Sequence, residues 1–337
     1  MYSFIRSILF LCPPEKAHHL SLAILRVLLH IPGMKLLVEM IARPTPKEIS
    51  LFGLKFKSYV GLAAGFDKNA EHTGLMQSLG FGFIEIGSVT YQSWAGNPQP
   101  RLFRLPKDAG IINRMGLNNE GALAVAKRLE TLDVSVPLFI NVAKTPDKSM
   151  SEAETIDDYC KSVSTLKSYA DVMVINISCP NADGGKTFED PMLLTQLLTG
   201  IRGVLSQEEK PLLIKLSPDL SVSELEQTIK VCESFGVSGY TATNTTTSRD
   251  NLITKRASIE SIGNGGLSGK PLHNRAVDTV RNIRTFTDKP IIGVGGVFDA
   301  KSAQRFISAG ASMVQIYSGF IYGGPLIVKR ISDGIRD

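Results

Sequence analysis

The stretch IIGVGGVFDAKSAQRFISAGASMVQIYSG (291–319) holds the pattern that decides the fold. Two short apolar runs, 291–294 and 313–316, flank a longer helix-like segment, which is the order of a unit with two parallel strands joined by a helix. Glycines end the first run, and Tyr317-Ser318-Gly319 follows the second. Because glycines let backbone N–H groups approach an anion, these two strand ends predict a phosphate-binding cup.

The same alternation continues towards the N-terminus, and the chain from residue 60 onward contains eight such units. The expected strands are 60–64, 83–86, 138–142, 172–177, 212–216, 239–243, 291–294 and 313–316. Eight units of this size match one closed (β/α)8 TIM barrel of the α/β class. A doubly wound open sheet is the competing fold, but no GxGxxG follows the first strand.

Polar residues lie where the predicted strands end. A strand that is buried on both faces is normally apolar, so these polar residues need a separate explanation. These ends are Gly65-Phe66-Asp67-Lys68, Ser88, Asn141, Asn176, Lys215, Thr243-Asn244, Gly295-Gly296 and Tyr317-Ser318. One such residue would be a cap or a turn residue, but the same decoration at eight ends predicts an enzyme site at the C-terminal face. Two long intervals, containing 100–119 and 265–269, are expected to be functional loops.

Composition excludes several other classes of site. The net charge is +5 with no run of Lys or Arg, so no nucleic-acid partner is expected. The four cysteines lie far apart without a CxxC pair, which leaves a disulfide framework, a zinc site and an iron–sulfur cluster unsupported. We therefore expect no metal, and free thiols favour a reducing compartment.

The N-terminal region is apolar but interrupted by charges, and no window offers the roughly 18–20 charge-free residues that span a bilayer. Amphipathic helices that break near Pro13-Pro14 and Pro32-Gly33 fit this pattern. Such helices could lie in a membrane interface or could form a cap on the core. We expect a helical segment at 1–43 and a barrel domain at 44–337.

Three side chains at the strand ends suggest chemistry, each with a structural alternative. Lys215 would be a cation beside a reduced flavin, or half of a buried ion pair. Lys68 would bind a substrate carboxylate, or Asp67 or Glu71. Cys179 would be a general base activated by a nearby cation, or an ordinary small buried residue. Asn-rich strand ends suit a flavin or a pyrimidine, since each amide both donates and accepts.

These residues resemble the dihydroorotate dehydrogenases over nearly the whole chain. The motifs that carry the resemblance are GLAAGFDKNA (61–70), EIGSVT (85–90), NPQPRLFRL (97–105), INRMGLNN (112–119), INISCPN (175–181), ATNTTT (242–247), GGLSGKPL (265–272), IIGVGG (291–296) and ASMVQIYSGFIYGGP (311–325). The N-terminal extension with Pro14-Glu15-Lys16-Ala17-His18 is similar to the membrane-associated class 2 branch, which passes electrons from FMN to a quinone.

The resemblance implies residue roles. FMN would be held by Ala63, Ala64, Gly65, Ser88, Asn141, Asn176, Lys215, Thr243, Gly269, Gly296, Tyr317 and Ser318. Dihydroorotate would be held by Lys68, Asn113, Arg114, Met115, Gly116, Leu117, Asn176, Asn181, Asn244 and Thr245. Quinone would approach His18, Arg104 and Tyr317. A base, here Cys179, would remove a proton from carbon 5 while a hydride leaves carbon 6, in the pyrimidine-biosynthesis step that gives orotate.

One departure from the class 2 pattern bears on the electron acceptor. Class 2 members have serine where this chain has Cys179, whereas the soluble class 1 enzymes have cysteine. A class 1-like enzyme using fumarate or NAD is therefore an alternative, and a tRNA dihydrouridine synthase or a non-catalytic flavin protein is a more remote one. The expected protein is a monomer, peripheral on the cytoplasmic face of a bacterial inner membrane.

Overall fold

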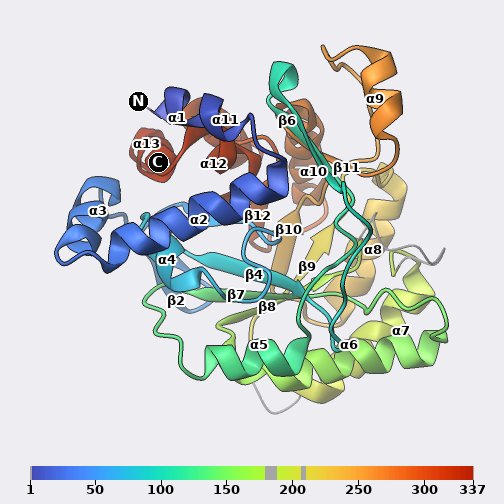
Figure 1. The fold of residues 1–337 in the computed structure, drawn as a ribbon. Helices are drawn as coiled ribbons and strands as arrows, with labels where there is room; N and C mark the ends of the chain where they lie inside the picture. The colour runs from blue at the N-terminus through green and yellow to red at the C-terminus, as the bar shows by residue number, and fades with distance from the viewer. Residues whose placement is uncertain (1, 179–187, 206–209, 337) are drawn as a thin grey trace.

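The computed structural model describes residues 2–178, 188–205 and 210–336, so that Cys179 and Asn181 lie outside the described residues. Its centre is a closed barrel in which every neighbouring pair of strands is parallel (Figure 1). The strands are β3 (Val60–Leu62), β4 (Ile84–Val89), β7 (Leu138–Val142), β8 (Val172–Asn176), β9 (Leu212–Leu216), β10 (Gly239–Ala242), β12 (Ile291–Val294) and β13 (Met313–Ile316). The predicted (β/α)8 barrel is confirmed.

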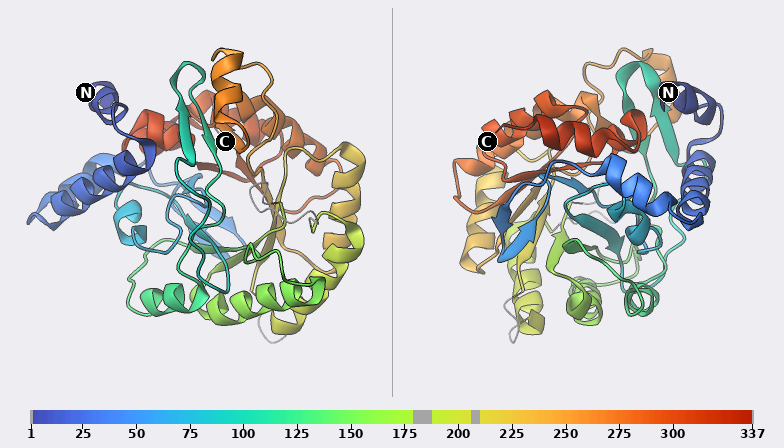
Figure 2. Two further views of the ribbon diagram at one scale, coloured as in Figure 1. Left: turned by 45° about the vertical axis from the view of Figure 1, so that its right-hand side comes forward. Right: turned by 90° about the vertical axis from the view of Figure 1, so that its left-hand side faces the viewer.

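Helices cover the outside of the barrel, one after each strand (Figure 2). They are α4 (Thr73–Gln77), α5 (Ala122–Leu129), α6 (Glu152–Leu166), α7 (Pro191–Leu205), α8 (Val222–Ser234), α10 (His273–Arg284), α11 (Ala300–Ser308) and α13 (Ile327–Gly334), with α9 (Arg256–Ile262) and α12 (Ser318–Gly323) as additions. Capping boxes begin α6, α8 and α11, because each N-cap side chain and the third helical side chain bond each other's backbone N–H.

A short hairpin lies under the N-terminal end of the barrel. It consists of β1 (Ile49–Leu51) and β2 (Leu54–Phe56). Phe56 packs edge-on against Phe83 and Phe139 at centroid distances of 5.7 and 6.3 Å. This aromatic cluster fills one end of the barrel, which leaves the opposite, C-terminal end for a site.

The two long loops form a structure that local patterns did not predict. Strands β5 (Leu102–Leu105), β6 (Gly110–Asn113) and β11 (Gly266–Gly269) pair as a three-stranded antiparallel sheet. It extends from the barrel as the teal hairpin of Figure 2, with β11 joining it from the other loop. Residues separated by about half the chain therefore meet at one rim of the site.

The N-terminal region forms three helices, α1 (Tyr2–Leu9), α2 (Pro14–His30) and α3 (Met34–Ala42), whose breaks fall at the predicted prolines. Among the described residues no single helix is long and apolar enough to cross a bilayer; α2 and α3 reach that level only as a pair, bent by 114°.

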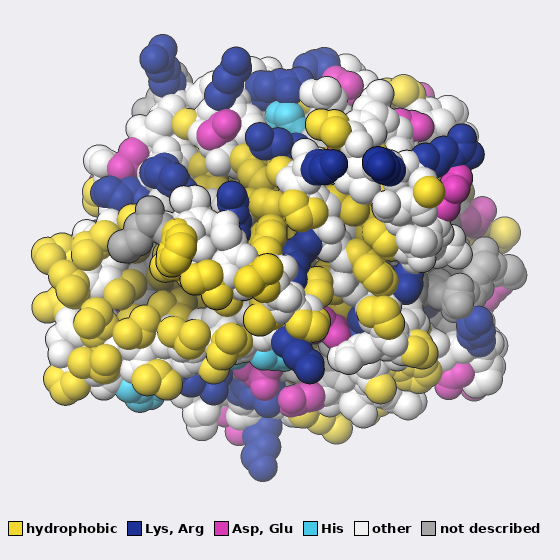
Figure 3. Space-filling view, turned by 45° about the horizontal axis from the view of Figure 1, so that its top comes forward, with side chains coloured by type: hydrophobic (Ala, Val, Ile, Leu, Met, Phe, Trp, Pro, Cys, Tyr) yellow, Lys and Arg dark blue, Asp and Glu magenta, His cyan; other side chains and the backbone are white. Residues whose placement is uncertain are grey.

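The apolar residues of these three helices are largely exposed. Among the described residues, thirteen of the eighteen exposed large hydrophobic side chains lie between residues 4 and 41. They include Leu11 at 86% exposure and Leu36 at 71%. Figure 3 shows the resulting hydrophobic surface on one side of the molecule. Exposed apolar patches of this kind are typical of interaction surfaces, and packing as a cap on the core does not by itself account for these side chains.

Candidate active site

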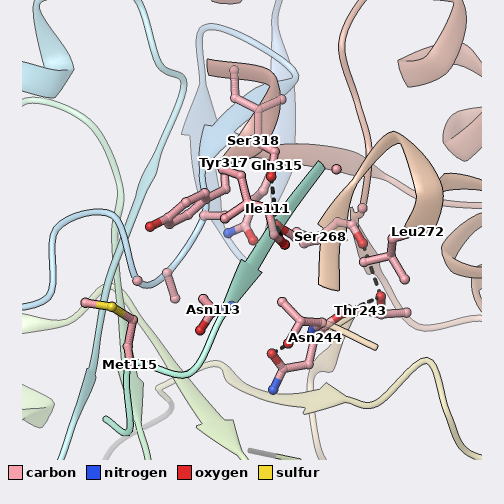
Figure 4. Close-up of a pocket in the computed structure, with 18 of the residues that line it drawn as sticks. Ile111, Asn113, Met115, Thr243, Asn244, Ser268, Leu272, Gln315, Tyr317 and Ser318 are labelled. Carbon is pink, nitrogen blue, oxygen red and sulfur yellow. Dashed lines mark hydrogen bonds between the residues drawn. The ribbon is translucent and has the colours of Figure 1, made fainter. Parts of the chain in front are cut away.

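A pocket opens at the C-terminal ends of the barrel strands and is covered on one side by the three-stranded sheet (Figure 4). Most residues predicted from the sequence line it together: Ala63, Ala64, Gly65, Lys68, Ser88, Asn113, Met115, Gly116, Leu117, Asn176, Lys215, Thr243, Asn244, Thr245, Gly269, Gly296, Tyr317 and Ser318. Asn113 belongs to β6 and Asn244 follows β10, so that separate parts of the chain supply polar groups to one cavity.

A carboxylate that sequence reasoning missed lies beneath this pocket. Glu85, on β4, is fully buried, and its Oε1 is 3.3 Å from the Lys215 Nζ. The amide of Asn141 donates to the same oxygen at 2.6 Å, and the amide of Gln315 donates to Oε2 at 2.6 Å. A buried charge is tolerated when it is paired and hydrogen-bonded, which is the situation here. Lys215 therefore both lines the pocket and forms the buried ion pair.

Asn141 lies behind the pocket wall and does not line it. Its side-chain oxygen accepts a hydrogen bond from Ser88 Oγ, and Ser88 Oγ in turn accepts one from the Asn176 amide at 3.1 Å. The chain from Glu85 through Asn141 to Ser88 and Asn176 is thus continuous. Such a connected network orients the two residues that face the cavity.

The glycine cup at the ends of β12 and β13 can only be built from residues without a Cβ. Gly296 has φ +62°, and a Cβ there would be 2.6 Å from the Gly269 carbonyl oxygen. A Cβ at Gly319 would be 2.0 Å from the Val297 carbonyl oxygen. Glycine at these positions lets the backbone pack closely at the last two strand ends, where Gly269, Gly296 and Gly319 line the pocket; such glycine-rich ends suit an anionic group.

Gln315 supports the same interpretation. Its Oε1 is buried, lies at the pocket and has no hydrogen-bond partner among the described residues. A buried acceptor without a partner is costly, and a ligand N–H can satisfy it. The glycine cup and this acceptor together fit a phosphorylated flavin.

Most of the predicted substrate residues that the structure describes line the pocket. Lys68 Nζ donates to Asn118 Oδ1, and the Asn113 amide donates to the Gly266 carbonyl at 3.3 Å. The Asn244 amide donates to the Ser178 carbonyl at 2.6 Å and to Asn176 Oδ1 at 3.3 Å. These contacts hold one cation and several amides around a common space, which suits a small planar anion with amide edges.

Arg114 has a different orientation from its neighbours in the loop. Its guanidinium lies 4.6 Å from the Phe103 ring and donates to the carbonyls of Ile262, Asn264 and Pro100. The side chain therefore joins two loops outside the pocket, while Met115, Gly116 and Leu117 line the cavity.

The three residues expected near a quinone lie where the N-terminal helices meet the rest of the chain: His18 is on α2, Arg104 is on β5 and Tyr317 follows β13. The His18 ring is 4.9 Å from that of Phe66, which is 5.6 Å from that of Tyr317. Arg104 lies against Phe10 at 4.4 Å and donates to the carbonyls of Leu9 and Cys12. His18 and Tyr317 thus share one aromatic neighbour, whereas Arg104 contacts the end of α1.

Burial shifts the pKa values of His18 and Tyr317 and so favours the neutral form of each side chain. Desolvation, with smaller repulsion from His19, His72 and Lys68, lowers the pKa of His18 to about 4. Burial, together with the charge of Glu15, raises the pKa of Tyr317 to about 12. Both side chains are therefore neutral near pH 7, which suits a passage for an uncharged molecule.

Besides the buried Glu85, sequence reasoning missed two polar side chains that line the pocket, Gln315 and Ser268. Ser268 on β11 contacts Ser318 Oγ at 2.9 Å. The signal for Glu85 and Gln315 was present, because each is a lone polar residue inside an apolar strand. The hydrogen bond between them joins residues 230 positions apart, and only the closed barrel brings them together.

Residues 47–337 match the family model described as "Dihydroorotate dehydrogenase". The "Dihydroorotate dehydrogenase (quinone)" of Haloarcula marismortui is 39% identical over 340 residues, which covers 100% of this chain and 94% of the relative. That of Mycobacterium leprae is 40% identical over 339 residues, 99% of this chain and 93% of the relative.

Solved structures agree with these matches. The Eimeria tenella DHODH in complex with ferulenol superposes with a TM-score of 0.82 at 31% identity, covering 96% of this chain and 90% of the other. The ligand-free Eimeria tenella enzyme gives 0.78 at 32% identity, covering 89% and 92%.

Proposed function

This chain belongs to the dihydroorotate dehydrogenase family, and on that premise we propose that it oxidises dihydroorotate to orotate in pyrimidine biosynthesis with a quinone as electron acceptor. The observation that carries the proposal is the match to quinone-dependent relatives along 99–100% of the chain, N-terminal helices included. The pocket supplies the complementary chemistry, with Lys68 and several amides on one side and the glycine cup on the other.

The cofactor is a flavin, and FMN is the form that the glycine cup favours, since FMN carries one phosphate. Gly269, Gly296 and Ser318 would surround that phosphate, while Lys215, Gln315 and Thr243 would face the ring. The bound flavin would supply the two-electron acceptor for the substrate and would pass the electrons on to the quinone. Glu85 fixes the position of Lys215, so the Lys215 ammonium group would stabilise negative charge on the reduced flavin ring.

The substrate-binding roles follow from position. Lys68 would neutralise the carboxylate of dihydroorotate, and Asn113, Asn176 and Asn244 would bind its amide edges. Arg114 would contribute through its backbone and through its contacts between loops. Cys179 would take the proton from carbon 5, and Asn181 would bind the ring; both lie outside the described residues.

The N-terminal segment, residues 1–43, would bring the quinone to the barrel domain, residues 44–337. Its exposed apolar face supports association with a membrane surface, where a lipid-soluble quinone resides. His18, Arg104 and Tyr317 would line the quinone's route. We propose further that the protein is a monomer that lies peripherally on the cytoplasmic face of a bacterial inner membrane.

Steady-state oxidation of dihydroorotate by the purified flavoprotein tests this function, with a ubiquinone analogue, fumarate and NAD offered separately. The full chain is compared with one lacking residues 1–42. We expect a strong preference for quinone that the truncation abolishes, while anaerobic bleaching of the flavin by dihydroorotate persists. A preference for fumarate or NAD would support the class 1-like alternative that Cys179 suggests, and absence of bleaching would exclude the substrate.

A further inference from the structure

An ion pair connects the N-terminal segment to the loop that carries the substrate residues. Glu15 lies in the first turn of α2, and its Oε1 is 2.7 Å from the Arg101 Nε. The two side chains are only 17% and 13% exposed, unlike the helix-surface pairs elsewhere, such as Lys230 and Glu226 at 72% and 40%. A half-buried, charge-assisted hydrogen bond holds its partners more firmly than an exposed pair does.

The Arg101 guanidinium also binds a loop on its other side. The Arg101 Nη1 donates to the Ala95 carbonyl at 2.8 Å and to the Asn97 carbonyl at 3.1 Å. Because the guanidinium is planar and rigid, the carboxylate on Nε fixes the direction of the Nη1 donors. Glu15 therefore sets the position of residues 95–97 through Arg101.

The segment 95–97 in turn lies directly against the substrate loop. The Asn97 N–H donates to the Met115 carbonyl at 3.1 Å, and the Asn97 side-chain amide donates to the Arg114 carbonyl at 2.9 Å. At Gly116, with φ +72°, a Cβ would be 2.7 Å from Asn97 Cγ. Met115 and Gly116 both line the pocket, so a shift of Asn97 displaces the pocket wall.

We propose that Glu15 and Arg101 are positioning residues that couple the docking of α2 to the substrate loop 113–117, so that affinity for the pyrimidine depends on the N-terminal segment. The proposal rests on the function given above for its choice of ligand. Neither side chain lines the pocket; they reach the substrate loop through Asn97 and through the Arg101 carbonyl, which accepts from the Arg114 N–H at 2.9 Å. The segment that receives the quinone thereby also influences the site where dihydroorotate binds.

The test uses the full-length flavoprotein and the variant Glu15→Gln, which keeps the shape of the side chain but removes its charge. We expect the Kd for orotate to rise by roughly 5- to 10-fold, with unchanged flavin content and an unchanged KM for the quinone analogue. Glu15→Asp should recover most of the affinity. Glu226→Gln applies the same chemical change to the exposed pair on α8 and should leave the Kd unaltered.

Hydrogen exchange without any ligand provides a second readout. In Glu15→Gln, amides of residues 94–97 and 111–118 should exchange faster, because the chain of contacts through Arg101 is loosened. Exchange faster only within α2, or an orotate Kd within twofold of the parent protein, would overturn the coupling. If the parent protein fails to bind orotate, the proposed function is wrong, and the exchange measurement still decides whether α2 and the loop are coupled.

Discussion

Leucine and isoleucine are abundant in both the barrel and the N-terminal helices, but they have opposite environments. Every residue of β9, from Leu212 to Leu216, is buried, including Lys215. In α3, Leu36 and Met40 are 71% and 68% exposed. Helices cover the outer face of the barrel strands, and the side chains of the inner face pack against one another inside the closed barrel. The N-terminal helices have only one packed side, so the burial of their apolar residues requires a surface outside the protein.

The largest expected effect concerns the barrel interior. Replacing Lys215 by Met removes the only cation within hydrogen-bonding distance of Glu85 among the described residues and leaves a buried carboxylate without countercharge. We expect a loss of about 3–5 kcal/mol in the free energy of unfolding, measured by urea denaturation, together with loss of the flavin.

The matched control for that substitution is Lys230→Met, which breaks the exposed pair with Glu226 on α8. Its unfolding free energy should change by less than about 0.5 kcal/mol. Equal losses of unfolding free energy in the two variants would contradict this expectation, because the buried ion pair would then contribute no more to stability than an exposed one.

A smaller effect should appear in the N-terminal segment. The double substitution Leu36→Gln, Met40→Gln removes apolar surface that is mostly exposed to solvent, so the unfolding free energy should stay within about 1 kcal/mol of the parent value. Binding to vesicles that contain anionic lipid, measured by flotation, should fall by roughly tenfold or more.

Leu123→Gln is the control for this pair. Leu123 is equally exposed, at 67%, but it lies on α5 of the barrel. Its substitution should leave vesicle binding unchanged. If it weakened binding as much as the double substitution does, the membrane-facing surface would not be confined to the N-terminal helices.

A pH dependence is expected at the boundary between the two regions. The pKa of His18 falls from 6.5 to about 4, so the folded protein binds a proton there less readily than the unfolded chain. Its contribution to stability is complete above pH 6.5 and is lost as the pH falls towards 4. The melting temperature of the parent protein should therefore decrease more steeply over this interval than that of His18→Gln. Parallel curves would show that His18 is not desolvated.

Much of the barrel could be predicted because its strands are short apolar runs between turn signals. Seven of the eight strands lie within the predicted ranges, and β7, β9, β12 and β13 match them fully. Strand β4 continues three residues past the prediction, since Gly87, Ser88 and Val89 extend it. The residues at the strand ends meet in one pocket for the same reason, because all parallel strands of a barrel end at one face.

What could not be predicted depends on contacts between distant segments. The pairing of β11 with β6 joins residues about 150 positions apart, and no local pattern encodes it. The orientation of Arg114 is set by the carbonyls of Ile262 and Asn264 in the other loop. The pairing of Glu85 with Lys215 and Gln315 likewise appears only when the barrel closes.

The contact between α1 and α12 has a consequence for synthesis of the protein on the ribosome. The Tyr2 hydroxyl donates to the carbonyl of Ile321, 319 residues further along, and the Arg6 guanidinium donates to that of Tyr322. At roughly 5–20 residues per second, translation needs about 16 to 64 seconds to supply those partners. During that interval α1 has emerged but cannot dock. Docking of α1 on the barrel is therefore a late step that must follow synthesis of α12.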